Sequence, residues 1–405
     1  MTKTEQIASL YSQFVIPTYA SPSRALVKGK GTRVWDAEGH VYLDFIAGIA
    51  VSNVGHCHPK VVAAIRDQAG TLMHVSNLFY TELQGRLAEK LSALSLKGKC
   101  FFCNSGAEAN EALIKLARLH GHARKRTEII SMTGSFHGRT LAALAATGQS
   151  KHQAGFEPMP KGFVHAPYND LEAVRALVTD KTAAILVEAV QGEGGVIPAD
   201  PAFLQGIRAL CTERDILMLC DEVQCGLGRT GHWFGYQAAG IEPDAFSLAK
   251  ALGSGLPIGA IVTSPRVADV FQPGKHGSTF GGNPVCVAAS LAMLAVIEEE
   301  NLVARASVAG ARFQAGLQAL VGNYEHVKAV RGAGLMLGLV LDQPAKPLVE
   351  TLCGMGLISL ATAESVVRFL PPLTVKDTEI DEALEIIEDA VAEWHGVARP
   401  QDEEG

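Results

Sequence analysis

Between residues 99 and 263, apolar positions alternate between strand-like runs and helix-like spacing. Most of the runs are separated by stretches with helical periodicity, at 107–121, 171–177 and 201–214. Because parallel strands need a crossover connection, this alternation predicts a mostly parallel sheet with helices on both faces. The six runs expected to form its strands are 99–103, 127–131, 184–188, 216–220, 245–248 and 258–263.

The pattern changes outside this region. Residues 32–45 alternate around a turn at Asp36–Gly39 and predict a β-hairpin. Helical spacing recurs on either side of the central region, and two short strands are expected near the end of the chain. The expected helices are 59–71, 82–94, 285–300, 304–320 and 378–394, and the late strands are 335–341 and 366–370.

The change of pattern near residue 285 predicts two domains of unequal size. We expect an α/β protein with a large domain over 51–290 that holds the mostly parallel sheet. A smaller α+β domain is expected over 291–405, with an N-terminal segment, 1–50, packed against it. The polar residues 398–405 are expected to fray.

Composition narrows the class of protein. The chain has 405 residues, 48% of them apolar, and a net charge of −7 without a dense basic run, so nucleic acid is not an expected partner. No run of eighteen apolar residues is present, which argues against a membrane span. The first residues lack a basic-then-apolar signal pattern, and the eight cysteines are scattered, so we expect free thiols in the cytoplasm.

Two cysteine motifs could suggest a metal site, but neither is complete. Cys100 and Cys103 have a CxxC spacing without a second such pair, and they lie in an alternating run that predicts a strand. His56, Cys57 and His58 are too close in sequence to face one ion without further ligands. We therefore expect no bound metal.

The main chemical signal is Lys250, which follows one apolar run about thirty residues after another ends in Asp221. An amine in apolar surroundings loses the solvation of its charged form, so its pKa falls and it can attack a carbonyl. A carboxylate at the end of a buried strand can keep a ring nitrogen protonated. A Schiff-base lysine and such a carboxylate are the two groups that pyridoxal 5'-phosphate (PLP) requires.

Several loops add candidate ligand contacts. Ser105 precedes a strongly helical stretch and Gly106 opens it, so the helix N-terminus could bind a phosphate. Phe136 could stack on a ring, and Arg139 could bind a carboxylate. Further polar or glycine-rich loops that could contact a ligand are 188–195 and 277–284.

The stretch 226–231 matches GxGxxG, the fingerprint of a dinucleotide site. That fingerprint should open a helix directly after a strand. Here Asp221 and Glu222 intervene and His232–Gly235 is a poor start for a helix. A nicotinamide-dependent dehydrogenase is therefore disfavoured.

Six motifs together resemble the class III PLP-dependent aminotransferases, and among these the acetylornithine aminotransferases most. They occur in the family's order and cover the chain from Tyr19 to the segment after Arg368. The resemblance implies a fold-type I (aspartate-aminotransferase-like) fold and a homodimer with active sites at the interface. The motifs are NSGAEANEA (104–112), SFHGRT (135–140), VEAVQGEGG (187–195), DEVQCGLGRTG (221–231), SLAKALGSGLPIGA (247–260) and GSTFGGNP (277–284).

The resemblance also implies roles at matching positions. Lys250 would bind the cofactor and move the substrate proton, and Asp221 would hold the pyridine nitrogen. Phe136 and Val223 would cover the two faces of the ring, and Gln224 would bond its hydroxyl. The phosphate would be held by Ser105, Gly106, Ala107 and, from the partner subunit, Thr279.

The substrate contacts follow by the same resemblance. The expected reaction moves an amino group from N2-acetylornithine to 2-oxoglutarate, forming glutamate, in arginine biosynthesis. Arg139 would bind the distal carboxylate of either donor, while Arg368 would bind the α-carboxylate of glutamate and pair with Glu193 when none is there. The remaining expected substrate contacts are Tyr19 and the partner's Ser278.

Alternatives remain open at the level of the donor. Ornithine, succinylornithine or another ω-amino donor would suit the same motifs, and a non-catalytic PLP-binding homologue is a further possibility that the retained Lys250 argues against. Ornithine aminotransferases resemble this chain but typically carry tyrosine where Ile49 stands, and an apolar side chain suits an acylated amine. Ala189 replaces the family's usual proline, which affects only local loop geometry.

Overall fold

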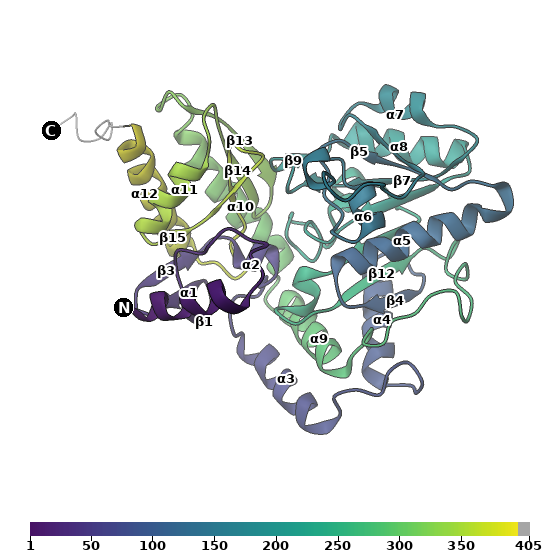
Figure 1. Cartoon of the computed structure of the whole chain (residues 1–405), viewed down its shortest axis with the longest axis horizontal. Helices are drawn as coiled ribbons and strands as arrows, with labels where there is room; N and C mark the ends of the chain where they lie inside the picture. The colour runs from purple at the N-terminus through teal and green to yellow at the C-terminus, as the bar shows by residue number, and fades with distance from the viewer. Residues whose placement is uncertain (396–405) are drawn as a thin grey trace.

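A seven-stranded sheet forms the centre of the computed structural model, which describes residues 1–395 (Figure 1). Its order is β4-β12-β11-β10-β7-β5-β6, and the five strands from β11 to β6 run parallel. β12 is antiparallel to both neighbours, so the sheet is mostly parallel, as predicted. The strands are β4 (Cys100–Cys103), β5 (Glu128–Met132), β6 (Phe163–Ala166), β7 (Thr182–Glu188), β10 (Leu217–Asp221), β11 (Ala245–Leu248) and β12 (Gly259–Thr263).

Alternate residues of each central strand are buried on opposite faces of the sheet. In β10, Leu217 and Leu219 join the apolar cluster of α5, whereas Met218 and Cys220 join that of α8. Burial on both faces explains why the strand reads as an uninterrupted apolar run. The helices of this part are α3 (Pro59–Thr71), α4 (Glu82–Leu94), α5 (Gly106–Gly121), α6 (Leu141–Ala146), α7 (Leu171–Leu177), α8 (Pro201–Glu213) and α9 (Pro284–Glu299).

A second, antiparallel sheet is formed by the C-terminal part of the chain in the order β13-β14-β17-β16. α10 packs on β13 and β14, and α11 and α12 pack on each other. The elements are α10 (Leu302–Ala319), β13 (Val327–Ala333), β14 (Met336–Leu341), α11 (Lys346–Gly354), β16 (Leu360–Thr362), β17 (Val366–Phe369) and α12 (Asp377–His395).

The N-terminal hairpin joins a third sheet, of order β1-β2-β3-β15. β3 (Val41–Asp44) pairs in parallel with β15 (Leu357–Ile358), so the purple N-terminal segment lies beside the yellow-green C-terminal one in Figure 1. The predicted boundary at residue 290 falls within α9, and the domain limits stay a prediction. The other elements at this end are α1 (Lys3–Phe14), β1 (Leu26–Lys30), β2 (Arg33–Asp36) and α2 (Ala47–Ala50).

Short elements complete the description. β8 (Val190–Gln191) and β9 (Ile197–Pro198) form a two-stranded sheet. Within residues 1–395, no helix is both long and apolar enough to cross a membrane. The tail 398–405, expected to fray, lies outside the described residues. The 3-10 helices are η1 (His122–Arg124), η2 (Ser150–His152), η3 (Gly235–Ala239) and η4 (Lys250–Gly253).

Candidate active site

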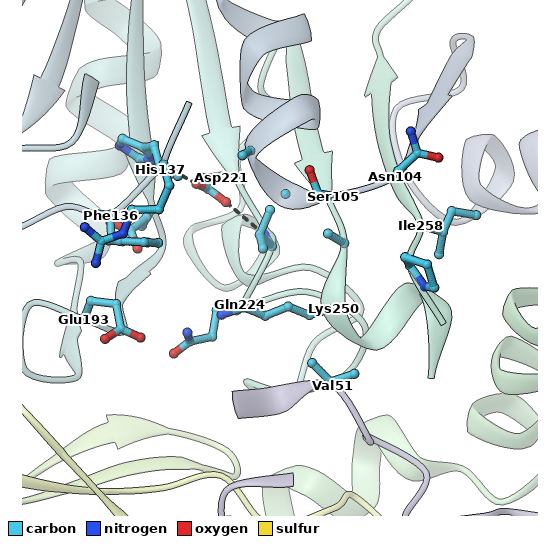
Figure 2. A pocket seen from close by; sticks show the side chains of 18 of the residues that line it. Val51, Asn104, Ser105, Phe136, His137, Glu193, Asp221, Gln224, Lys250 and Ile258 are labelled. Carbon is cyan, nitrogen blue, oxygen red and sulfur yellow. Dashed lines mark hydrogen bonds and ion pairs between the residues drawn. The ribbon is translucent and has the colours of Figure 1, made fainter. Parts of the chain in front are cut away.

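A cleft of about 490 Å³ lies where three parallel strands end (Figure 2). β7 ends at Glu188 and β10 at Asp221, and Lys250 follows β11 by two residues. The carboxyl ends of parallel strands are the usual ligand site of open α/β sheets. The predicted residues that line the cleft are Ser105, Gly106, Ala107, Phe136, Arg139, Glu193, Asp221, Val223, Gln224 and Lys250.

Lys250 begins η4, with its backbone in the left-handed region at φ 46°. Its side chain extends along the cleft beside Gln224 (Figure 2). Loss of solvation, reinforced by the positive charge of Arg368, lowers the pKa of the Lys250 amine to about 8. A substantial fraction of the amine is therefore unprotonated near neutral pH, which is the nucleophilic form.

The carboxylate of Asp221 accepts a dense set of hydrogen bonds. Oδ2 accepts from His137 Nδ1 at 2.8 Å and from Asn110 Nδ2 at 2.7 Å. Oδ1 accepts from the Val223 amide at 3.0 Å and, more weakly, from Ser247 Oγ at 3.4 Å. These hydrogen bonds fix the orientation of the Asp221 carboxylate.

Sequence reasoning missed the partners of Asp221. His137, Asn110 and Ser247 each lie inside one of the six motifs, but neither the motifs nor the local pattern assigns them a role. All three are buried polar side chains that converge from β11, α5 and the loop after β5. Their position inside these motifs was the only indication of a functional role in the sequence. The local pattern does not indicate which polar residues face the same carboxylate.

The N-terminus of α5 forms one end of the cleft. Ser105 Oγ accepts from the Glu108 amide at 3.1 Å, as the predicted cap requires, while the Glu108 carboxylate accepts from the Asn104 amide at 2.7 Å. A Cβ at Gly106 would lie 2.9 Å from Val223 Cγ1. The absence of a side chain at Gly106 thus leaves space where the free amides of the first turn can reach an anion.

An ion pair between a buried arginine and a half-buried glutamate lies at another side of the cleft. Arg368, fully buried on β17, donates from Nη1 to Glu193 Oε1 at 2.7 Å and to Gln224 Oε1 at 3.1 Å. Burial alone would raise the pKa of Glu193, but the adjacent guanidinium lowers it below the usual value. Nε and Nη2 of Arg368 are buried and have no partner among the described residues. The guanidinium therefore has donors left for a further acceptor.

Phe136 and Arg139 lie in one loop. The Arg139 guanidinium carbon is 5.4 Å from the centroid of the Phe136 ring, within the range of a cation–π contact. The Phe136 amide donates to Glu188 Oε2 at 3.2 Å, which attaches the loop to the end of β7. Arg139 is exposed and so is accessible to an anionic ligand.

Four predicted ligand residues do not line this cleft in the single chain, and one of them, Arg368, reaches it through its hydrogen bonds to Glu193 and Gln224. Ser278 and Thr279 line a separate hollow of about 410 Å³. That hollow adjoins the cleft, because Asn104 lines both and its Nδ2 donates to Ser278 Oγ at 3.0 Å. Tyr19 is 88% exposed. Roles for these residues stay predictions.

Two further expectations can be compared with the structure. The GxGxxG match at 226–231 forms a loop of turns and opens no helix, and its Arg229 is fully buried. Ile49 packs beside an apolar cluster, and Val51 rather than Ile49 is among the cleft residues. Among the described residues, no group of three His, Cys, Asp or Glu side chains could hold a metal ion.

The cleft fits PLP on its own geometry. An amine of lowered pKa, a fixed carboxylate and a helix N-terminus that begins with glycine line the same cleft. Lys250 could bind the aldehyde, Asp221 the ring nitrogen and the first turn of α5 the phosphate.

Comparison with known proteins identifies the class. Residues 16–391 match the model of aminotransferase class III, so the chain belongs to this family of PLP-dependent enzymes. It is 51% identical over 391 residues to acetylornithine aminotransferase from Gloeobacter violaceus, covering 95% of this chain and 98% of that protein. The acetylornithine aminotransferase of Methanocaldococcus jannaschii is 47% identical over 392 residues, which cover 96% and 98% of the two chains.

Solved structures agree with this assignment. Ornithine aminotransferase from Toxoplasma gondii ME49 superposes with a TM-score of 0.94 at 33% identity, covering 98% of this chain and 96% of that one. A second structure of the T. gondii enzyme has partial occupancy of PLP at its active site. Acetylornithine aminotransferase from Elizabethkingia anophelis has a TM-score of 0.87 at 31% identity, with 97% and 100% coverage.

Proposed function

We propose that this aminotransferase transfers the terminal amino group of N2-acetyl-L-ornithine to 2-oxoglutarate, giving N-acetyl-L-glutamate 5-semialdehyde and L-glutamate, as a step of arginine biosynthesis. The observation that carries the proposal is the ion pair of the buried Arg368 with Glu193 beside Lys250, with Arg139 exposed on another loop of the same cleft. The acetylornithine aminotransferases at 47–51% identity support the choice of donor.

The charge arrangement suits two different donors. In acetylornithine the reacting amine is terminal, so no carboxylate lies beside it, and Glu193 can stay paired with Arg368. In glutamate a carboxylate adjoins the amine and can take the unused donors of Arg368, Nε and Nη2, while displacing Glu193. Arg139 is placed to bind the distal carboxylate of either donor.

The residues of the cleft then either transfer a proton or contact the bound cofactor. When bound, PLP supplies a ring that accepts electrons from the substrate carbon. Lys250 binds the cofactor and later carries a proton at its amine, a role that its lowered pKa favours. Asp221, held by His137 and Asn110, keeps the ring nitrogen protonated. Phe136 and Val223 cover the two faces of the ring, Gln224 bonds its hydroxyl, and Ser105, Gly106 and Ala107 hold the phosphate.

The active enzyme is proposed to be a homodimer with shared sites. An exposed apolar patch adjoins the loop that holds Ser278 and Thr279, since Asn77 Nδ2 donates to the carbonyls of Ser278 and Gly281. Exposed apolar patches of this kind mark interfaces, and a second copy would bring both residues toward its own cleft. The patch consists of Leu72, Met73, Leu78, Phe79, Tyr80 and Phe280, all 42–108% exposed.

We also place the enzyme in the cytoplasm. All eight cysteines are free thiols, including Cys100 and Cys103, which lie in the same strand. Free, mostly buried thiols are usual in a reducing compartment.

The test is the visible absorbance of purified protein loaded with PLP, with each donor added separately. We expect the cofactor band to bleach at a much lower concentration of N2-acetylornithine than of ornithine. Equal bleaching by both donors would agree with an aminotransferase but contradict the proposed preference for the acetylated donor. Bleaching by N2-succinylornithine at the lowest concentration would assign that donor instead.

A substitution of Lys250 tests the role of the amine. Lys250→Ala should retain PLP through the other contacts of the cleft but lose turnover by several orders of magnitude, because the same group is nucleophile and proton carrier. Cofactor retention is measured by absorbance after gel filtration, and turnover by release of glutamate. Near-normal turnover would contradict the assignment.

A further inference from the structure

The ends of β7 and β10 place two carboxyl groups side by side. Glu188 and Asp221 are the last residues of adjacent parallel strands and are partners in the strand register. Both line the cleft, and their exposed fractions are only 6% and 4%. Two carboxylates buried this close together cannot both ionise without a large cost, since each disfavours the charge of the other.

The two carboxyl groups differ in the number of hydrogen bonds that they accept. Asp221 accepts hydrogen bonds from His137, Asn110, Ser247 and the Val223 amide. Within the described residues the carboxyl of Glu188 has one donor, the Phe136 amide at 3.2 Å, and no ion pair. Where neighbouring acids have such unequal environments, the better-solvated one carries the charge and the other carries the proton.

We propose that Glu188 is an uncharged carboxylic acid in the working enzyme, a positioning residue that holds the Phe136 amide and leaves Asp221 as the anion of the pair. The proposal rests on the function above for the identity of the bound ring. It does not depend on which amino donor is used.

The charged groups around Glu188 agree with this assignment. Burial and the charge of Asp221 raise the pKa of Glu188 well above its ordinary value. Glu193, from the loop after β8, adds a further negative charge, and Lys250 is the cation that opposes it, but no ion pair joins Lys250 to Glu188. The hydroxyl of Tyr168 donates a hydrogen bond to the backbone carbonyl of Glu188 at 2.8 Å, and not to its carboxyl group.

An uncharged Glu188 has two consequences for the cleft. Each ligand of the enzyme carries an anionic group, a carboxylate on both substrates and the phosphate on the cofactor. A second carboxylate beside Asp221 would repel them in a site of low dielectric. The neutral acid avoids this repulsion and still fixes the loop that carries Phe136 and Arg139.

Infrared difference spectroscopy tests the charge state directly. The C=O stretch of an un-ionised carboxylic acid should appear in the wild-type protein at the near-neutral pH of the activity assay and should remain in Glu222→Gln. Glu222 is the matched control, because burial raises the pKa of its carboxyl to about 7 and it lies outside the cleft. Its band should fade as pH rises through that value and be missing in Glu222→Gln.

The wild type and Glu222→Gln alone decide the assignment if Glu188 variants fail to fold. A band at neutral pH in both proteins supports an uncharged Glu188. Its absence from Glu222→Gln overturns the proposal. No amino donor is used, so this result is independent of whether acetylornithine proves to be the substrate.

Substitution of Glu188 supplies the second test. Glu188→Gln keeps the shape and the neutral charge, so the pH midpoint of the PLP absorbance band should move by less than about 0.3 units and kcat by less than about threefold. If Glu188 were ionised, removing its charge would move that midpoint by about one unit or more, and this outcome would overturn the proposal. Glu188→Ala should lower kcat more than Glu188→Gln, because it also releases the Phe136 amide.

Discussion

Glu193 is the residue on which the use of two donors depends. Glu193→Gln can still accept from Arg368 Nη1 but lacks the charge that competes with a substrate carboxylate. We expect the ratio of kcat/KM for glutamate to that for acetylornithine to rise by about tenfold or more, equivalent to ~1.4 kcal/mol, because the substrate carboxylate no longer has to displace an anion from Arg368. Single-turnover absorbance with each donor measures the two half-reactions.

Glu364 provides a matched control for this substitution. It lines the neighbouring hollow that shares Glu193 and is exposed. Glu364→Gln removes one acidic charge nearby without touching Arg368, so the ratio should stay within about twofold. An unchanged ratio in Glu193→Gln would show that Glu193 does not compete with glutamate.

At the scale of residues, the sequence indicated the side chains that line the cleft better than the buried residues that hold those side chains in place. Lys250 and Asp221 end or follow apolar runs, and that position identified them. The buried partners Asn110, His137 and Ser247 are distributed over 138 residues of the chain, and only folding brings them to one carboxylate. Contacts made at such sequence separations have no periodic signature.

At the scale of elements, the loop of the GxGxxG match connects two sheets through Arg229. Its Nη1 donates to the carbonyls of Leu335 and Pro371 at 2.8 and 2.5 Å, and Nη2 donates to Asn53 Oδ1 at 2.6 Å. Leu335 directly precedes β14, and Pro371 follows β17 by two residues. The guanidinium thus fixes the strand pair that carries Arg368.

Arg229→Met should therefore destabilise the fold. It leaves two or three buried acceptors without a donor, at roughly 1–3 kcal/mol each, so we expect a loss of about 3 kcal/mol or more in denaturant unfolding. Arg214→Met, which removes an exposed guanidinium paired only with its neighbour Glu213, should change stability by less than about 0.5 kcal/mol. Equal stabilities of the two variants would rule out this role for Arg229.

Two of the elements that sequence periodicity missed, α1 and β13, lack a buried stripe. α1 has no buried residue, so its helix leaves no apolar repeat. β13 alternates poorly, with one fully buried residue, Val327, at its start. In contrast, the buried runs of the central sheet were predicted within about two residues, because their apolar content follows directly from burial on both faces.

For the whole molecule, the proposed dimer can be tested through its apolar patch. Tyr80→Asp places a charge on a side chain that is fully exposed in one chain, and a dimer would bury it. We expect this variant to sediment as a monomer and to lose most of its turnover, because the loop with Ser278 and Thr279 would no longer reach a second cleft. Analytical ultracentrifugation combined with an activity assay measures both effects.

Val308→Asp serves as the control for this experiment. Val308 is 67% exposed on α10, outside the patch, so this variant should keep the sedimentation and activity of the wild type. A Tyr80→Asp variant that remains dimeric and active would place the interface elsewhere.

The pairing of β3 with β15 also bears on how the chain is made. Leu43 pairs with Leu357, which leaves the ribosome 314 residues later. At about 5–20 residues per second the hairpin waits roughly 15–60 s for its partner strand. During that interval its edge and its apolar side chains are open to other nascent chains. The yield of this protein should therefore depend on the rate of its synthesis.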